Sequence, residues 1–230
     1  MRRKSQLLYS LLFFFISSTA YAQIKKSKTW DLSVHGGIIL PNTDLSQSRN
    51  SSQIGLGYSI TKFILPFLAL QEQLLVCKLK SDEVGNGSNS KYKFETNTIF
   101  SPSIHILLQF GNVGFLKAVP NLTIYGSAGI GIMKFSPTVF RDDSTFARNY
   151  YVQNNLIDNT VDYSETTTLT YPLAAGIKYR IRTHLSLHLE YSQRLTNTDK
   201  LDGWYQLSSG NDRFGYLNLG VTVHIGKVED

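Results

Sequence analysis

Hydrophobic and polar residues alternate along most of this chain with a period of two, which is the side-chain period of a β-strand. Between residues 30 and 40 the even positions are apolar apart from Gly36, while Asp31, Ser33 and His35 occupy odd positions. We predict eight strands with this pattern, over residues 30–40, 54–64, 67–80, 92–110, 122–135, 168–181, 185–194 and 217–225.

Strands that cross a membrane as a closed barrel alternate in this way, because their backbone groups pair between strands and one face of the sheet meets lipid. A soluble secreted barrel or sandwich alternates too, but one eight-stranded sheet with polar side chains inside has no core in which to bury its apolar face. The prediction is therefore an all-β fold: an eight-stranded antiparallel up-and-down transmembrane β-barrel, rather than a soluble lipocalin-like or sandwich fold.

The third predicted strand leaves its register open. Leu70, Leu74 and Val76 share a face with Glu72, an acidic residue among positions expected to meet lipid. Either this carboxylate lies near the lipid head-groups, or a β-bulge shifts the register of the strand.

Long polar connections alternate with shorter ones along the chain. The long ones are 41–53, 81–90, 136–165 and 196–212. Outer-membrane barrels show this asymmetry, with short periplasmic turns and long outer loops, so we expect both mature termini in the periplasm. The segment 136–165 is too long for a bare connection, and is a functional surface loop, an extension of the strands above the membrane, or mobile.

The N-terminal segment 1–22 has the features of a signal peptide. The basic start Arg2-Arg3-Lys4 is followed by an apolar stretch at 7–16 and by Ala20-Tyr21-Ala22, a small-x-small site for signal peptidase. The apolar stretch is too short to cross a bilayer as a helix, which needs about 20 residues. We expect the mature barrel domain to occupy 23–230.

Charge and cysteine content exclude several other classes of protein. Lys+Arg 23 against Asp+Glu 17 leave a net charge of +6, with no clustered basic face after residue 28, so we expect no nucleic-acid partner. The single cysteine, Cys77, excludes an intramolecular disulfide and a cysteine-built zinc site.

Several charged residues fall on the inward face of the predicted strands. An eight-stranded barrel encloses a space that side chains fill, whereas open aqueous channels belong to barrels of about sixteen strands. Opposite charges in a narrow lumen favour paired side chains, since an unpaired desolvated charge is costly. We therefore predict a plug rather than a pore lining, built by Lys93, Glu95, Lys178, Arg180, His188, Glu190 and Arg194.

The remaining polar residues do not have the spacing of an enzyme or metal site. His184 and His188 are four residues apart, which on a strand separates them by roughly 13 Å. Asp199, Asp202 and Asp212 are a candidate calcium cluster in the last outer loop, but they are also ordinary turn residues, which is the interpretation we prefer. We expect no catalytic residue, no metal and no cofactor.

The stretch 185–226 carries the motifs of a known family. These are Glu190-Tyr191, Thr198-Asp199-Lys200-Leu201-Asp202-Gly203, Asn211-Asp212 and Leu219-Gly220-Val221. Together with the strand at 124–131, they resemble the N-terminal barrels of OmpA-like outer-membrane proteins from Gram-negative bacteria, and the resemblance runs weakly over the whole mature chain. Larger members continue into a peptidoglycan-binding domain, a role that we do not carry over to this chain. The family loop motif comprises Asp199, Asp202, Gly203, Asn211 and Asp212.

The last predicted strand is similar to the signal that such barrels show to their assembly machinery. Asn218, Gly220, Val223 and Ile225 follow its order of a polar residue, a glycine and two hydrophobes. The strand departs from the usual pattern because it ends on Ile rather than an aromatic residue and is followed by five more residues, 226–230.

These observations predict a non-enzymatic outer-membrane protein with a structural or interaction role, carried by its outer loops or its periplasmic turns. Its expected partners are outer-membrane lipid and lipopolysaccharide, the barrel-assembly machinery during insertion, and an envelope protein. The main alternative is a small passive, porin-like channel, followed by a lipid-modifying or proteolytic barrel enzyme.

Overall fold

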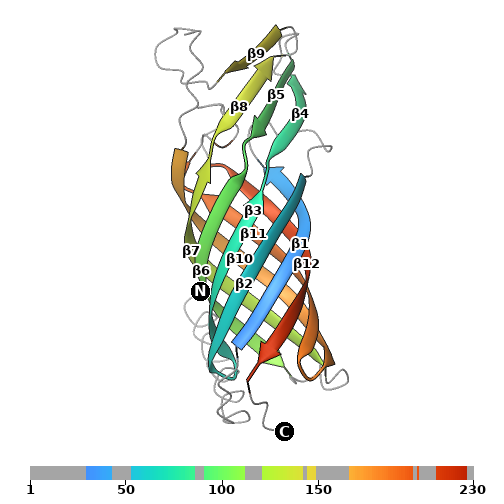
Figure 1. Ribbon diagram of the computed structural model, residues 1–230. Coiled ribbons are helices and arrows are strands. Elements are labelled where there is room, and N and C mark those ends of the chain that lie inside the picture. Colours follow the sequence, from blue (N-terminus) through green and yellow to red (C-terminus); the bar gives the residue numbers. More distant parts are fainter. Residues whose placement is uncertain are drawn as a thin grey trace, which may run out of the picture.

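The computed structural model describes residues 30–42, 53–85, 91–111, 121–141, 144–148, 166–198, 201 and 211–226 (Figure 1). For residues 81–85, 91–94, 111, 138–141 and 144–148 it describes the backbone. The predicted signal peptide, 1–22, lies outside the described residues.

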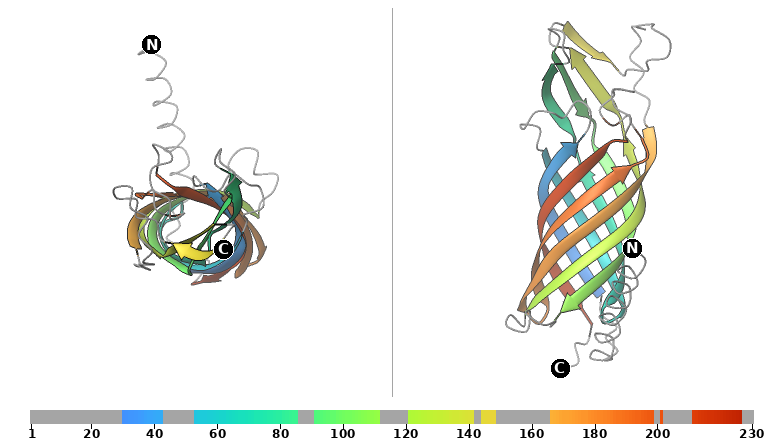
Figure 2. Two further views of the ribbon diagram at one scale, coloured as in Figure 1. Left: turned by 90° about the horizontal axis from the view of Figure 1, so that it is seen from above. Right: turned by 180° about the vertical axis from the view of Figure 1, so that it is seen from behind.

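Eight antiparallel strands close into a barrel, as the alternation predicts (Figure 2). The ring is closed by β1 and β12, which pair from Trp30 opposite Ile225 to Asn42 opposite Arg213. A closed barrel has no free sheet edge, so the backbone groups of its wall pair within the wall. In their order around the ring, the strands are β1 (Trp30–Asn42), β12 (Arg213–Ile225), β11 (Leu185–Thr196), β10 (Thr166–Arg182), β7 (Leu122–Phe135), β6 (Ile99–Gly111), β3 (Leu68–Cys77) and β2 (Gln53–Leu65).

The two ends of the barrel differ. At one end, which we call the turn end, the turn at 66–67 joins β2 to β3 and the turn at 183–184 joins β10 to β11. The first residue of β1, Trp30, pairs there with Lys62 and with Ile225, the last residue of β12. The first barrel strand therefore begins, and the last one ends, at the turn end. We call the opposite end the loop end.

A second, four-stranded sheet stands beyond the loop end (Figure 1). Its strands, in order, are β4 (Lys80–Gly85), β5 (Lys91–Thr96), β8 (Pro137–Arg141) and β9 (Ser144–Arg148). Because β4 follows β3, β5 precedes β6 and β8 follows β7, three of these strands extend barrel strands. Of the three alternatives for 136–165, an extension of the strands is therefore correct for β8, and β9 pairs with β8. Residues 142–143 and 149–165 lie outside the described residues.

The predicted single strand 92–110 is in fact two strands, and the junction has a local cause. β5 ends at Thr96 and β6 begins at Ile99. Between them, Thr96 N–H donates to Leu79 O over 2.8 Å and Asn97 N–H donates to Ser136 O over 3.0 Å. Ser136 N–H in turn donates to Asn97 Oδ1 over 2.8 Å. Four polar residues in a row, 95–98, interrupt the alternation here, but the period on either side does not say that the two segments join different sheets.

The barrel carries apolar side chains on its outer face and, over most of its length, polar side chains in its lumen. Outward residues are apolar and exposed, with Val34 at 69% and Ile54 at 77%, whereas inward residues such as Ser33 (7%) and Thr222 (0%) are polar and buried. Such a wall is stable where its outer face meets lipid rather than water, which confirms the membrane barrel over a soluble fold. Among the described residues, no helix is long and apolar enough to cross a membrane.

The register of β3 is continuous around Glu72. β3 pairs with β6 without interruption, from Leu68 opposite Leu108 to Cys77 opposite Ile99. Toward β2, the register shifts only near Leu65, at the turn end. No bulge redirects Glu72, so this exposed carboxylate lies on the outward face of the wall.

Candidate functional site: the filled lumen

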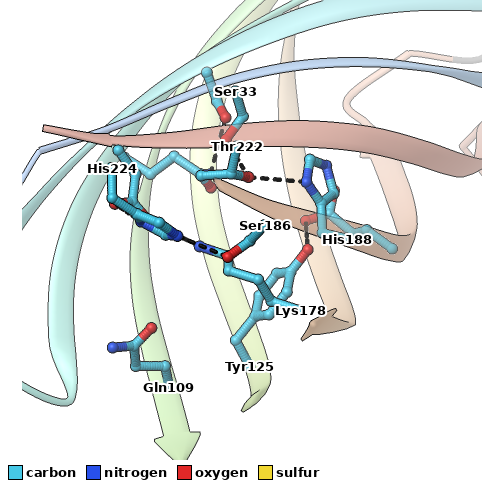
Figure 3. A network of polar contacts seen from close by, with 12 residues as sticks. Ser33, Gln109, Tyr125, Lys178, Ser186, His188, Thr222 and His224 are labelled. Carbon is cyan, nitrogen blue, oxygen red and sulfur yellow. Dashed lines mark hydrogen bonds and ion pairs between the residues drawn. The ribbon is translucent and has the colours of Figure 1, made fainter. Parts of the chain in front are cut away.

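Near the turn end, a carboxylate inside the barrel binds two basic groups. Asp31 Oδ2 accepts a hydrogen bond from Lys178 Nζ over 2.8 Å, and Asp31 Oδ1 lies 2.6 Å from His224 Nδ1. The other ring nitrogen, His224 Nε2, lies 2.7 Å from Ser186 Oγ (Figure 3). The side chain of Asp31 is 2% exposed, so Lys178 rather than water compensates its charge. This cluster connects β1, β10, β11 and β12.

A second polar group occupies the middle of the lumen. Glu190 Oε2 accepts a hydrogen bond from Tyr125 OH over 3.0 Å, and Glu190 Oε1 accepts one from Asn218 Nδ2 over 3.3 Å. His188 Nδ1 lies 3.1 Å from Thr222 Oγ1 (Figure 3). These contacts join β7, β11 and β12 across the barrel.

Arg194 lies closer to the loop end and has neutral partners among the described residues. It is 0% exposed. Its Nη1 donates to Ser101 Oγ over 2.9 Å and its Nη2 donates to Gln73 Oε1 over 2.6 Å. Gln73 Nε2 also lies 3.4 Å from His35 Nε2. The guanidinium therefore links β11 to β3 and β6 on the other side of the lumen.

An apolar layer closes the lumen at the loop end. Its members are at most 4% exposed, and most belong to the last inward positions of the strands at this end. An ion entering such a layer would lose its hydration without gaining polar partners. The layer consists of Ile39, Leu75, Cys77, Leu79, Ile99, Met133, Phe135, Leu201, Phe214 and Tyr216.

The alternating pattern does not predict this layer, because it implies polar residues on the inward face throughout. A local signal was present: the apolar runs Ile38-Ile39-Leu40 and Leu74-Leu75-Val76 break the alternation near the loop end of two strands. In a membrane barrel, apolar residues on both faces indicate a strand segment whose outer face meets lipid and whose inner face packs in an apolar interior.

Asp212 organises the base of the last loop. Its Oδ2 accepts a hydrogen bond from Leu201 N–H over 2.8 Å, and its carbonyl oxygen accepts one from Thr196 Oγ1 over 2.6 Å. Leu201 is thereby held in the apolar layer. Within the described part of the chain, no three His, Cys, Asp or Glu side chains are grouped to hold a metal ion. Of the remaining loop-motif residues, Asn211 is exposed, and Asp199, Asp202 and Gly203 lie outside the described residues.

The structure places the predicted plug residues at different sites. His188, Glu190 and Arg194 are buried in the lumen, and Lys178 is half-buried there. Arg180 is exposed at the turn end, where it pairs with Ser186. Asp31, which binds Lys178 and His224, lies on the polar face of the first predicted strand but is absent from the predicted plug set.

The prediction was wrong for Glu95. This residue belongs to β5, where it pairs with Lys80 of β4 and Thr138 of β8 in the second sheet, beyond the barrel. The chain crosses from the second sheet into the barrel between Thr96 and Ile99, so Glu95 does not reach the lumen. The backbone of Lys93 lies in β5 as well, and its side chain is outside the described residues.

One residue of the predicted assembly signal is required by packing in the lumen. Gly220 pairs with His35 on one side and His188 on the other. A Cβ atom at Gly220 would come within 2.5 Å of His188 Cε1 and 2.6 Å of His35 Cβ, so a larger residue has no room. Recognition by the assembly machinery stays a prediction. Of the other signal residues, Asn218 is buried, and Val223 and Ile225 are exposed on the outer wall.

The fold and its lumen define a class: a closed, antiparallel, eight-stranded membrane barrel filled by its own side chains. The family model described as outer membrane protein beta-barrel domain matches residues 8–224, and the chain belongs to this family. This confirms the outer-membrane β-barrel that the sequence motifs predict. A comparison with curated proteins finds no match.

Several solved structures are similar to this chain. Neisserial surface protein A is 13% identical with a TM-score of 0.51, over 84% of this chain and 96% of that chain. Ail, the attachment invasion locus protein of Yersinia pestis, in complex with the heparin analogue sucrose octasulfate, is 10% identical with a TM-score of 0.50, over 87% and 100%. The N-terminal barrel of Pseudomonas aeruginosa OprF is 14% identical with a TM-score of 0.46, over 86% and 98%. At these identities the likeness concerns the fold alone.

Proposed function

We propose that this outer-membrane barrel is a non-enzymatic anchor that presents its loop end to another component of the cell envelope or cell surface. In this proposal the signal peptide 1–22 directs export, both mature termini and the turn end lie in the periplasm, and the loop end faces outward. Outer-membrane lipid and lipopolysaccharide surround the wall, and the barrel-assembly machinery inserts it.

The observation that carries the proposal is the closed lumen. The cluster around Asp31, the contacts of Glu190 and the neutral partners of Arg194 connect strands across the barrel. The apolar layer lies above them at the loop end. A passive channel needs a continuous hydrated path, and eight strands leave space only for side chains. These features support a structural barrel over a porin-like channel.

The second sheet supports the loop end as the interacting end. Short connections suffice to join barrel strands, yet this chain extends β3, β6 and β7 into a further sheet of four strands. Strands that continue beyond the membrane hold their backbone groups in a defined position, so a partner can bind them with little loss of conformational entropy.

Photo-crosslinking in intact cells tests the interaction. A photoreactive residue replaces Val84 in β4, and a matched control carries the same residue at the exposed Asn121 at the turn end. We expect a discrete protein adduct from position 84 and none from position 121. Adducts from position 121 alone would move the interaction to the periplasmic turns, and none from either position would contradict an interaction role.

Conductance tests the closed lumen separately. The purified barrel is inserted into a planar bilayer, and we expect no steady single-channel current. A reproducible current from correctly folded protein would overturn the proposal in favour of the channel.

A further inference from the structure

Two charged residues interrupt the apolar outer wall between its two ends. On the described outward positions these are Lys62 of β2 and Glu72 of β3. Glu72 is the middle one of the outward positions of β3, which are Leu68, Leu70, Glu72, Leu74 and Val76. It therefore lies at the middle of its strand, with apolar outward positions on both sides.

Apolar side chains surround Glu72 on the outer face. Its cross-strand partners are Ile60 on β2 and Ile104 on β6, and the latter is 51% exposed. No hydrogen bond or ion pair joins Glu72 to another described residue. A carboxylate in hydrocarbon is costly without a partner, and ionisable residues at this depth characteristically mark a functional contact.

Lys62 lies one strand away, at a diagonal position to Glu72. In register it pairs with Leu70 of β3 and with Trp30 of β1. Its Nζ lies 5.1 Å from the centroid of the Trp30 ring, so the ammonium is directed toward β1 and away from β3. The wall therefore presents a cation and an anion on neighbouring strands, and the structure does not pair them.

We propose that this face binds a second copy of the chain, with Lys62 of each copy paired with Glu72 of the partner subunit. Two copies in one membrane share their orientation, so a twofold axis relating them runs along the membrane normal and keeps each residue at its own depth. An axis between β2 and β3 places β2 of one copy against β3 of the other. A surface with opposite charges on two adjacent strands is then complementary to itself.

The surroundings favour this pairing. Ile60, Leu70, Leu74 and Ile104 form an apolar margin around the two charges, and contact between two such margins excludes lipid and water from the ion pairs. Polar contacts between membrane-embedded surfaces stabilise association because each group exchanges hydrocarbon for a polar partner. The dimer does not depend on the proposed role of the loop end, since the wall and the loops are separate surfaces.

Disulfide trapping in native membranes tests the position of the interface. Leu70→Cys on β3 places a thiol next to both charges. The matched control is Leu189→Cys on β11, on the opposite side of the ring, because both leucines are 44% exposed. The native Cys77 is 4% exposed in the lumen and stays in both variants. We expect covalent dimers from Leu70→Cys and none from Leu189→Cys.

Charge reversal in two separately tagged copies tests the pairing itself. Lys62→Glu alone and Glu72→Lys alone should each lose the dimer, because like charges then face each other in both pairs. When the two variants are expressed together, the glutamate introduced at position 62 meets the lysine introduced at position 72, and the unchanged Glu72 meets the unchanged Lys62. We expect the two tags to copurify in this mixture, and Leu70→Cys to trap the mixed dimer.

The outcomes separate the alternatives. An ion pair within one chain would not be restored by mixing the two variants, so two single variants that both stay monomeric in the mixture overturn the proposal. A wild-type barrel that is monomeric in lipid nanodiscs and gives no more trapped dimer from Leu70→Cys than from Leu189→Cys also overturns it. A different protein trapped at Leu70→Cys would replace the second copy with another membrane partner.

Discussion

Replacing Asp31 by alanine should strongly destabilise the barrel. The change removes the carboxylate that contacts Lys178 Nζ over 2.8 Å and His224 Nδ1 over 2.6 Å. Breaking a buried ion pair by removing one partner costs about 3–5 kcal/mol. The Lys178 side chain is 15% exposed and so retains some contact with water. We therefore expect a loss at the lower limit, about 3 kcal/mol in the free energy of unfolding.

The measurement is reversible urea unfolding of the barrel in lipid vesicles, followed by tryptophan fluorescence. The control is Lys178→Met, alone and combined with Asp31→Ala. Removing both charges takes away the unpaired cation, so the double variant should be less destabilised than the sum of the single variants by about 1–3 kcal/mol. A loss below about 1 kcal/mol for Asp31→Ala, or exact additivity in the double variant, would refute the reasoning.

Three further predictions address other parts of the molecule. Gly220→Ala should cost about 1–3 kcal/mol in the same unfolding assay, because its Cβ would meet the His188 ring at 2.5 Å, whereas Gly126→Ala, whose nearest contact is at 3.6 Å, should have little effect. Phe214→Ala should cost about 3–5 kcal/mol by opening a cavity in the apolar layer. Phe214→Leu, which keeps most of the volume, should cost under about 1.5 kcal/mol, and equal losses for the two would contradict close packing there. N-terminal sequencing of the membrane-inserted protein should begin at Gln23, and a start at Met1 would exclude cleavage of the signal peptide.

The break between β5 and β6 shows one limit of sequence patterns. The four polar residues 95–98 interrupt the alternation between Tyr92 and Phe110, and the chain changes sheet there. A polar run of this kind does not by itself say that the strands on its two sides join different sheets. At this junction Asn97 exchanges two hydrogen bonds with Ser136, which is distant in the chain. A local period reports which face a side chain occupies and carries no information on which sheet its strand joins, and for this reason Glu95 was assigned to the lumen incorrectly.

The sequence by itself determined the wall of this protein. A period of two over eight segments, with apolar residues on one face and polar residues on the other, is compatible with a membrane barrel and with little else. The same pattern identified His188, Glu190 and Arg194 as inward residues, because the face of a strand residue depends only on its position in the alternation.

Only the tertiary structure decided which inward residues meet. Lys178 and Asp31 are 147 positions apart, and His224 and Asp31 are 193 positions apart. Their contact depends on closure of the ring between β1 and β12 and on the register of each strand pair, which sets the depth of every side chain along the lumen. The outward position of Glu72 was settled in the same way, by the unbroken pairing of β3 with β6. Local alternation fixes neither closure nor register, since both arise from pairing between segments that are far apart in the chain.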